Sequence, residues 1–209
     1  MKSIKKLLAL TLACAAAASL AACGSSAPKQ TASSGASGDA SAAGTDAGKT
    51  YLIATDTTFA PFEFQNESGE FVGIDMDLLK AIAEDQGFSY EIQVLGFDAA
   101  VQSLQAGQSD AVIAGMSITP ERQDTFDFPE PYFDSGVVMG IKAGNEEIKS
   151  YEDLRGKNVA VKTGTEGSAF AESIKAEYGF TTTYFKDSSN MYEDVISGNS
   201  AACFEDYPV

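Results

Sequence analysis

The chain has 209 residues, of which 44% are hydrophobic and 21% charged, and these ordinary values exclude a wholly disordered or collagen-like protein. Asp and Glu outnumber Lys and Arg by 30 to 14, giving a formal net charge of −16, which argues against a nucleic-acid partner because phosphate backbones require clustered basic charge. The absence of His removes Ser-His-Asp and Cys-His mechanisms and every His-ligated metal site.

Residues 1–22 have the pattern of an export signal. Several Lys residues precede an apolar stretch from Leu7 to Leu20, which is too short for a comfortable membrane span. The stretch ends in Leu20-Ala-Ala-Cys23, which resembles the lipobox of bacterial lipoproteins and implies a lipidated Cys23 at the start of the mature chain. An ordinary cleaved signal followed by an unrelated Cys is the alternative, and Cys14 is a poorer candidate because less apolar sequence precedes it.

Residues 23–50 continue from this Cys as a stretch of mostly Gly, Ser, Ala and Thr. Such a composition cannot bury enough apolar surface to offset its ordering entropy, so it predicts a disordered linker between the lipid and the folded part. After cleavage the chain would hold only Cys23 and Cys203, so no internal disulfide is expected. Cys203 lies in an apolar run, which predicts a small buried hydrophobe rather than a reactive thiol.

From residue 51 the sequence alternates between short apolar runs, which predict strands, and apolar residues spaced three or four apart, which predict helices. In chain order we expect a strand at 51–54, a helix within 73–87, a strand at 90–95, a helix at 98–105 that stops at Gly107, and a strand at 110–114. This β-α-β-α-β order predicts a parallel sheet with helices on its faces.

A second unit repeats this logic after an extended apolar run at 135–142. We expect a strand at 158–161, a helix at 165–178 capped by Gly179, a strand at 181–185, a helix at 188–196 starting at a Ser cap, and a strand at 201–204. The chain therefore predicts two α/β lobes, lobe 1 at 51–138 and lobe 2 at 139–209, with a hinge and a cleft where small ligands favour binding. Because the sequence stops directly after a strand, we expect lobe 2 to be incomplete and the sequence to be a fragment lacking its C-terminal part.

Polar residues follow four of the expected strands, and ligands of open α/β sheets bind outside the carboxyl ends of the strands. These exits lie at 55–56, 115–122, 162–165 and 205–206. They supply two cations, several acids, and backbone N–H groups at two helix starts, where an anion is stabilised. A zwitterion requires that mixture of charges.

No metal or cofactor is expected from the sequence. The acids at 75 and 77 do not follow the spacing of a calcium-binding loop. The segment Gly164-Thr-Glu-Gly167 lacks the Gly-Lys-Ser/Thr ending of a phosphate-binding P-loop.

Five segments, taken in order, resemble one family. They are ATDTTFAPFEF at 54–64, GIDMDL at 73–78, DAVIAGMSITPER at 110–122, FDF with PY within 126–132, and VKTGT at 161–165. Together they resemble the extracellular solute-binding proteins of polar amino acid ABC importers, and the resemblance covers nearly everything after the linker. It implies the type II periplasmic-binding fold, an α/β fold of two lobes with a hinge and an interlobe cleft.

The resemblance also implies which residues hold the amino and carboxyl groups of the ligand. Arg122 matches the Arg that binds the α-carboxylate, for which a planar guanidinium with two parallel donors is suited. Ser117 and Thr165 match residues whose backbone N–H groups complete that contact. Asp206 matches the carboxylate that pairs with the α-ammonium, helped by the Gly115 carbonyl.

Four further residues match positions around the ligand side chain. Phe59 and Phe97 match the aromatic residues that sandwich it, and Asp56 and Lys162 match residues that face its tip. An amide suits this pair because it donates to the acid and accepts from the ammonium, so glutamine is the first expectation, and glutamine-binding members look most similar around 161–165. Glu205 adds negative charge and keeps a basic amino acid open as the alternative.

Each of these residues also has a plainer interpretation. The two Phe side chains could be ordinary core, Asp56 a turn former, Lys162 a surface Lys, and the polar residues of 117, 122, 165 and 206 ordinary helix-start or chain-end groups.

We therefore expect a monomeric receptor, anchored outside the cell membrane through Cys23, that binds a free amino acid and presents it to an ABC permease. Two other functions stay open from the sequence. One is a metal-free cyclohexadienyl dehydratase, an enzyme class that shares the scaffold. The other is a stand-alone sensor domain.

Overall fold

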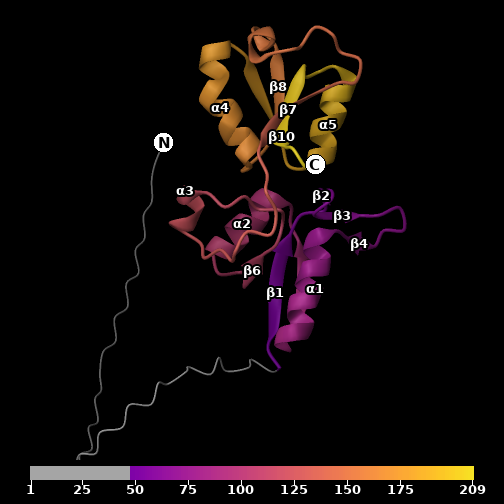
Figure 1. Cartoon of the computed structure of the whole chain (residues 1–209), viewed down its shortest axis with the longest axis vertical. Coiled ribbons are helices and arrows are strands. Elements are labelled where there is room, and N and C mark those ends of the chain that lie inside the picture. Colours follow the sequence, from indigo (N-terminus) through magenta and orange to yellow (C-terminus); the bar gives the residue numbers. More distant parts are fainter. Residues whose placement is uncertain (1–47) are drawn as a thin grey trace, which may run out of the picture. The chain divides into compact units, whose positions relative to one another are not determined.

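The computed structural model of the protein describes residues 48–209 (Figure 1). The expected signal peptide, Cys23 and all but the last residues of the expected linker lie outside this range. Within 48–209, no helix has both the length and the apolar character needed to cross a membrane.

The first sheet has the order β5-β1-β6 and is parallel throughout, as the sequence predicts. Its central strand β1 covers Thr50–Thr55, between β5 at Ser89–Val94 and the short β6 at Ala111–Val112. Helices α1 (Ile74–Gln86) and α2 (Phe97–Gln105) connect these strands. β6 is shorter than the strand expected at 110–114, but it still places residues 113–117 beyond the carboxyl end of the sheet.

A small antiparallel sheet precedes α1, and sequence periodicity does not predict it. It consists of β2 (Thr58–Phe59), β3 (Glu63–Gln65) and β4 (Phe71–Val72). The start of α1 packs directly on it, because the N–H of Asp75 donates to the carbonyl of Phe62 at 2.9 Å. Gly73 permits this approach, since a Cβ there would lie 2.1 Å from the Phe62 carbonyl oxygen.

The second sheet has the order β7-β10-β8-β9. Strands β8 (Asn158–Lys162), β9 (Thr181–Phe185) and β10 (Ala202–Asp206) are parallel neighbours, and β7 (Val137–Ile141) joins β10 in the antiparallel sense. The apolar run at 135–142 is thus extended, as expected, and it is also an edge strand. The expected lobe boundary between residues 138 and 139 falls inside β7 and stays a prediction.

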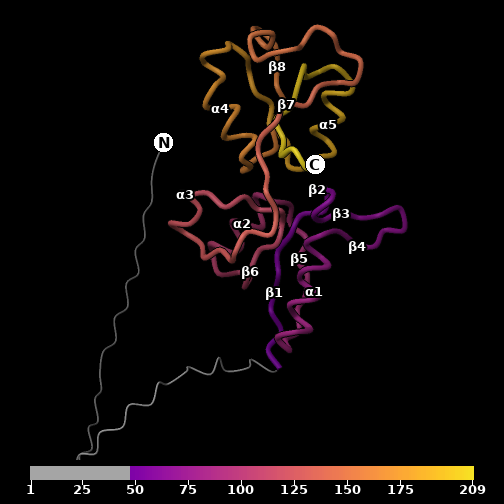
Figure 2. The backbone as a smooth tube through the Cα atoms, in the orientation of Figure 1, coloured from indigo at the N-terminus to yellow at the C-terminus, as the bar shows by residue number. Residues whose placement is uncertain are grey.

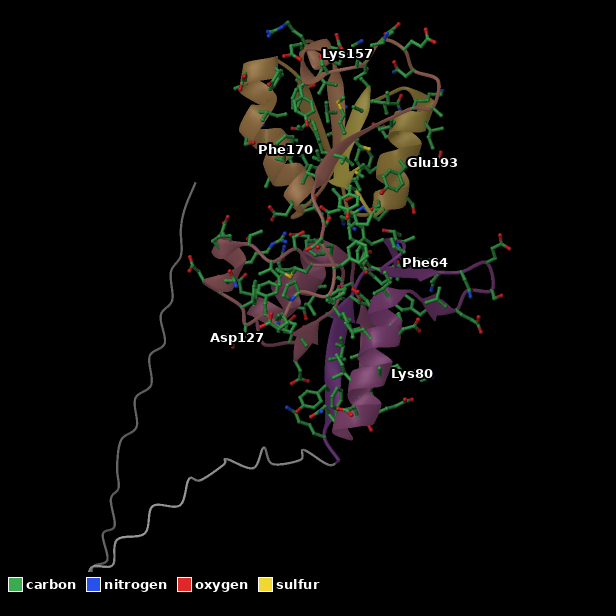
Figure 3. All side chains as sticks on the ribbon, viewed as in Figure 1. Phe64, Lys80, Asp127, Lys157, Phe170 and Glu193 are labelled. Atoms are coloured by element: carbon green, nitrogen blue, oxygen red, sulfur yellow. The ribbon has the colours of Figure 1, made fainter. Side chains whose placement is uncertain are left out.

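Helices α4 (Glu166–Tyr178) and α5 (Ser188–Ser197) cover opposite faces of the second sheet, as the ribbon and the backbone tube both show (Figures 1 and 2). The alternation of side chains along β8 and β10 separates two apolar clusters. Phe204 packs with Phe170, which Figure 3 labels on α4, whereas Cys203 packs with Met191 and Val195 of α5. The prediction that Cys203 is a buried hydrophobe is confirmed, because its side chain is 5% exposed.

Helix ends follow the sequence signals with one correction. Gly87 and Gly179 end α1 and α4 in the left-handed conformation, as expected. The expectation that a Ser caps α5 is wrong, because Asp187 caps it and accepts a hydrogen bond from the Asn190 N–H at 2.8 Å. Ser188 is instead the first helical residue, and its hydroxyl is free to point into the protein. A short 3-10 helix, η1 (Tyr151–Leu154), links β7 to β8.

Candidate binding site

The exits of three strands, β6, β8 and β10, meet at one small cavity. Its volume is about 10 Å³, room for about one water molecule. It is lined by Phe59, Phe97, Ala114, Gly115, Ser117, Arg122, Lys162, Thr165, Glu166 and Asp206. Every predicted site residue except Asp56 lines it, and Asp56 bonds directly to a lining residue. Glu166 is the one charged lining residue that the sequence did not indicate.

Arg122 reaches from helix α3 (Pro120–Gln123) across to the start of α4. Thr119 caps α3 and accepts a hydrogen bond from the Arg122 N–H at 3.2 Å. The guanidinium donates to the Ser117 carbonyl at 2.8 Å and the Gly164 carbonyl at 3.0 Å, and it pairs with Glu166 at 3.2 Å. Burial lowers the pKa of Arg122, and the carboxylate of Glu166 opposes that shift. These fixed partners hold a planar donor group at the cavity wall.

Lys162 and Asp56 form a buried ion pair between the exits of β8 and β1. The ammonium lies 2.5 Å from the Asp56 carboxylate, and each side chain is 2% exposed. The other carboxylate oxygen of Asp56 accepts from the N–H of Thr57 at 2.7 Å. The plainer interpretation of Lys162 as a surface residue is therefore wrong. A pair so deeply buried is stable only when further hydrogen bonds satisfy both charges.

Ser188 extends this pair into a polar network beneath the cavity. Its hydroxyl accepts from the Lys162 ammonium at 3.3 Å and donates to Glu205 at 3.1 Å. Tyr192 donates to the same Glu205 oxygen at 3.0 Å, and burial raises the pKa of Tyr192 above its usual value. Sequence reasoning missed Ser188 and Tyr192, because their role depends on the place of Glu205 on another element.

Asp206 ends β10 at the cavity wall with 9% of its surface exposed. Burial, followed by the neighbouring charge of Glu205, raises the pKa of Asp206 to about 6, and Arg122 opposes the shift. Its carboxyl is thus placed between cations and acids. A ligand ammonium would supply the positive charge that favours its ionised form.

Thr165 and Gly115 shape the backbone of the cavity. Thr165 caps α4 by accepting from the Ser168 N–H at 3.2 Å. Because Thr165 also lines the cavity, the positive end of that helix faces the cavity. Gly115 has φ +53, and a Cβ there would lie 2.6 Å from the ring of Phe59. Only a glycine allows the ring to lie so close to the strand exit.

Two buried aromatic rings flank the Lys162 ammonium. Its nitrogen lies 4.7 Å from the ring centroid of Phe59 and 5.8 Å from that of Phe97. The Arg122 guanidinium lies 5.5 Å from the Phe97 centroid. The rings therefore present apolar faces to the space between the two cations, and favourable cation–π contacts hold them there. Within 48–209, no group of three or more Cys, Asp or Glu residues is arranged to hold a metal.

Comparison with known proteins defines the class of this fold and site. Residues 51–200 match the model of the bacterial extracellular solute-binding proteins, family 3, and the chain belongs to that family. The arginine-binding extracellular protein ArtP of Bacillus subtilis is 32% identical over 97% of this chain and 74% of that protein. The histidine-binding periplasmic protein of Escherichia coli K12 is 34% identical over 74% of this chain and 59% of that protein. The chain thus spans only part of the length of these relatives.

Solved structures confirm the predicted fold class, the type II periplasmic-binding fold. An ancestral arginine-binding protein bound to arginine has a TM-score of 0.71 at 39% identity, covering 75% of this chain and 70% of that chain. An ancestral arginine-binding protein bound to glutamine has a TM-score of 0.70 at 40% identity, covering 75% of this chain and 69% of that chain. An ancestral amino acid-binding protein described as a precursor of cyclohexadienyl dehydratase gives 0.70 at 34% identity, over 76% and 70%.

Proposed function

We propose that the protein is the receptor of an ABC importer, lipid-anchored through Cys23, that binds a polar amino acid in this cavity and delivers it to the permease. One observation carries the proposal: a guanidinium, a helix N-terminus and a carboxyl converge on one cavity between two aromatic rings. Arg122 and the start of α4 suit an α-carboxylate, and Asp206 suits an α-ammonium. The names of the relatives, which are amino acid-binding proteins, support the same class of ligand.

Glutamine is the first choice for the ligand. An amino acid is larger than the cavity, so its binding requires the walls to move, and we place its side chain between Lys162 and Asp56. A carboxamide replaces their bond with two bonds, because its NH₂ donates to Asp56 and its carbonyl accepts from Lys162. A Lys or Arg ligand would instead bring a cation to Lys162, and like charges ~4 Å apart repel by ~4 kcal/mol at an effective dielectric near 20.

A basic amino acid is the second candidate, and a specific observation favours it. Glu205 and Glu166 add two carboxylates near the cavity, which leaves acids in excess of the two cations. Asp56 could then pair with a ligand cation while Lys162 turned to Glu205 through Ser188. Two of the relatives are named as arginine- and histidine-binding proteins.

Titration calorimetry with each common amino acid, on the full-length protein that the gene encodes, tests the proposal. A ligand at ~100 times its Kd also adds ~2.7 kcal/mol to the unfolding free energy, which a thermal-shift screen detects. Binding of glutamine alone supports the amide argument. Binding of arginine or lysine keeps the receptor and overturns the choice of glutamine. No binding at all, together with turnover of prephenate, moves the function to the dehydratase class.

The Arg122→Ala variant tests the assignment of the carboxylate-binding residue. We expect it to lose about 2–5 kcal/mol of binding free energy, because it leaves the ligand carboxylate buried without its partner. Arg155→Ala is the matched control, since that side chain is exposed and neither it nor Glu177, its hydrogen-bond partner, lines the cavity. Equal affinities of the two variants would contradict the assignment.

A further inference from the structure

A pair of acids is buried behind the cavity wall, one in the small antiparallel sheet and one in the helix that follows it. Glu63 begins β3 and Asp75 lies in the first turn of α1, and both are 0% exposed. No predicted site residue explains why two carboxyl groups are buried together here. Burying both as anions would be very costly, so the two carboxyl groups are not both ionised.

Hydrogen bonds distinguish the two acids. One carboxylate oxygen of Asp75 accepts from the Gly115 N–H at 2.7 Å, and the other accepts from the Tyr132 hydroxyl at 2.7 Å. Asp75 also lies at the positive end of α1, which favours its charge. By contrast, no backbone N–H, hydroxyl or cationic group within 48–209 donates a hydrogen bond to either carboxyl oxygen of Glu63, whose polar contact is with Asp75. The anion therefore belongs on Asp75 and the proton on Glu63.

The two donors to Asp75 come from functionally different segments. Gly115 begins the strand exit that carries Ser117, whose carbonyl holds the Arg122 guanidinium. Tyr132 lies on the segment that leads to β7 of the second sheet, and its ring packs edge-on against Phe62. Asp75 thus joins the exit that forms the cavity wall to the chain that runs on to the other sheet.

We propose that Glu63 and Asp75 form a buried acid pair in which Glu63 carries the proton and Asp75 the charge, and that Asp75 positions the Gly115–Ser117 exit for ligand binding. Asp75 is a positioning residue, because it acts through Gly115 and not on the ligand. The second half of this inference rests on the proposed function, whereas the first half does not.

The electrostatics of the surrounding groups agree with this assignment. Burial, then the charge of Asp75, raises the pKa of Glu63 to about 10. Asp56 raises the pKa of Glu63 further, and the Lys162 ammonium opposes the shift. Tyr132 is the remaining titratable group at the pair, and burial together with its bond to Asp75 raises its pKa, so it stays a donor.

Infrared spectroscopy in D₂O at pH 8 tests the protonation state without any ligand. Asp206, with a pKa of about 6, is ionised at this pH. A C=O band of a protonated carboxyl group can therefore be assigned to Glu63. We expect the wild-type protein to show this band and the Glu63→Gln variant to lack it. A missing band, or one that persists in Glu63→Gln, overturns the acid pair.

Binding titrations with glutamine and with arginine test the positioning role. Glu63→Gln keeps a neutral group of the same shape, so its affinity should stay within about threefold of wild type. Asp75→Asn removes the negative charge and one of the two acceptor oxygens, which weakens the bonds that hold the Gly115 N–H and the Tyr132 hydroxyl, and we expect its affinity to fall at least tenfold. Asp77→Asn, an exposed residue of the same helical turn, is the matched control for the charge change and should bind normally. Wild-type affinity in Asp75→Asn overturns the positioning role.

A variant with a smaller change covers the case in which Asp75→Asn does not fold. Tyr132→Phe removes only the phenolic donor and keeps the ring contact with Phe62. We expect a severalfold loss of affinity with an unchanged fold, and no loss would overturn the link through Tyr132. If the wild-type protein binds no amino acid, the proposed function fails, and the infrared band still decides the acid pair.

Discussion

Two oppositely charged side chains next to the cavity are almost completely buried. Lys162 and Asp56 are each 2% exposed, so their mutual attraction and their hydrogen bonds have to offset the loss of hydration of both charges. Removing one of them leaves the other as an uncompensated buried charge. The pair therefore governs stability as well as the recognition of a ligand side chain.

Lys162→Met should lower the unfolding free energy by about 3–5 kcal/mol, because it leaves the Asp56 carboxylate buried without a cationic partner. Urea denaturation measures this loss. Lys157→Met is the matched control: Lys157 pairs with Glu147 at 3.6 Å with side chains 37% and 80% exposed, and it lies at the far end of the second sheet (Figure 3). Its loss should stay below about 1 kcal/mol. Equal losses in both variants would contradict the burial argument.

Asp206 gives the protein a pH dependence near its raised pKa. In the folded protein this pKa is about 6, against an ordinary value of 3.8. Folding thus disfavours the ionised form. The contribution of Asp206 to the free energy of unfolding is fully present below pH 4, and at most about 3 kcal/mol of it is lost as the pH rises through 6. Ligand affinity should move oppositely, because a ligand ammonium requires the ionised carboxylate.

Calorimetric titration between pH 4.5 and pH 8 at intervals of about one unit measures this effect. We expect the affinity to rise through pH 6 and then level off. Asp206→Asn should bind weakly at every pH with a flat profile. A wild-type affinity that is constant through pH 6 would exclude Asp206 as the ammonium partner.

At the scale of elements, close packing of α4 on β10 fixes the position of the helix start that faces the cavity. Gly167 lies in the first turn of α4, and a Cβ there would lie 2.5 Å from the Phe204 carbonyl oxygen. The contact is with backbone, which cannot turn aside as a flexible side chain would. The absence of a side chain at this position therefore sets how near Thr165 and Glu166 come to the cavity.

Gly167→Ala should lower the unfolding free energy by about 1–3 kcal/mol, since the clash outweighs the better helix propensity of Ala. It should also weaken ligand binding, because it shifts the N-terminus of α4. Gly136→Ala is the control: nothing lies within 4 Å of its added Cβ, so its effect should stay within about 0.5 kcal/mol. Thermal unfolding and calorimetry on the pair check both effects, and a neutral Gly167→Ala would disprove the close contact.

Sequence patterns predict the long elements of this fold well and the short ones poorly. β1, α1, α4 and β9 have enough residues for a period of two or of 3.6 to emerge. Strands of two or three residues, such as β2 and β4, have no period at all. β7 reads as an extended connection, because its antiparallel partner β10 lies far along the chain.

The candidate site was predictable where residues follow strands, and not where they meet across elements. Arg122, Lys162 and Asp206 stand at strand exits, which the sequence locates, and the structure gathers them at one cavity. Ser188 and Glu63 give no such signal. Ser188 resembles a helix cap in the sequence, and Glu63 lies between two Phe residues with no pattern that predicts its role, although it is 0% exposed. Burial of a polar residue depends on contacts that no local pattern contains.

At the scale of the whole molecule, the net charge of −16 produces a field that acts on any ligand before it reaches the cavity. Salt screens this field, because the Debye length falls from ~30 Å at 0.01 M to ~8 Å at 0.15 M. The ion pair of Lys162 with Asp56 is buried and is screened much less. Long-range and local electrostatics can therefore be separated by ionic strength.

Ionic strength then distinguishes the two ligand classes. Glutamine has no net charge, so its affinity should change less than about twofold between 0.01 and 0.15 M salt. Arginine carries a net positive charge that the acidic protein attracts, so any arginine affinity should fall severalfold over the same range. Calorimetry of both amino acids at the two salt concentrations measures this, with the melting temperature as internal check, since screening the self-repulsion of the acidic chain should raise it. If glutamine affinity fell as steeply as arginine affinity, the salt would be acting inside the cavity itself, and the argument from the buried Lys162–Asp56 pair would no longer hold.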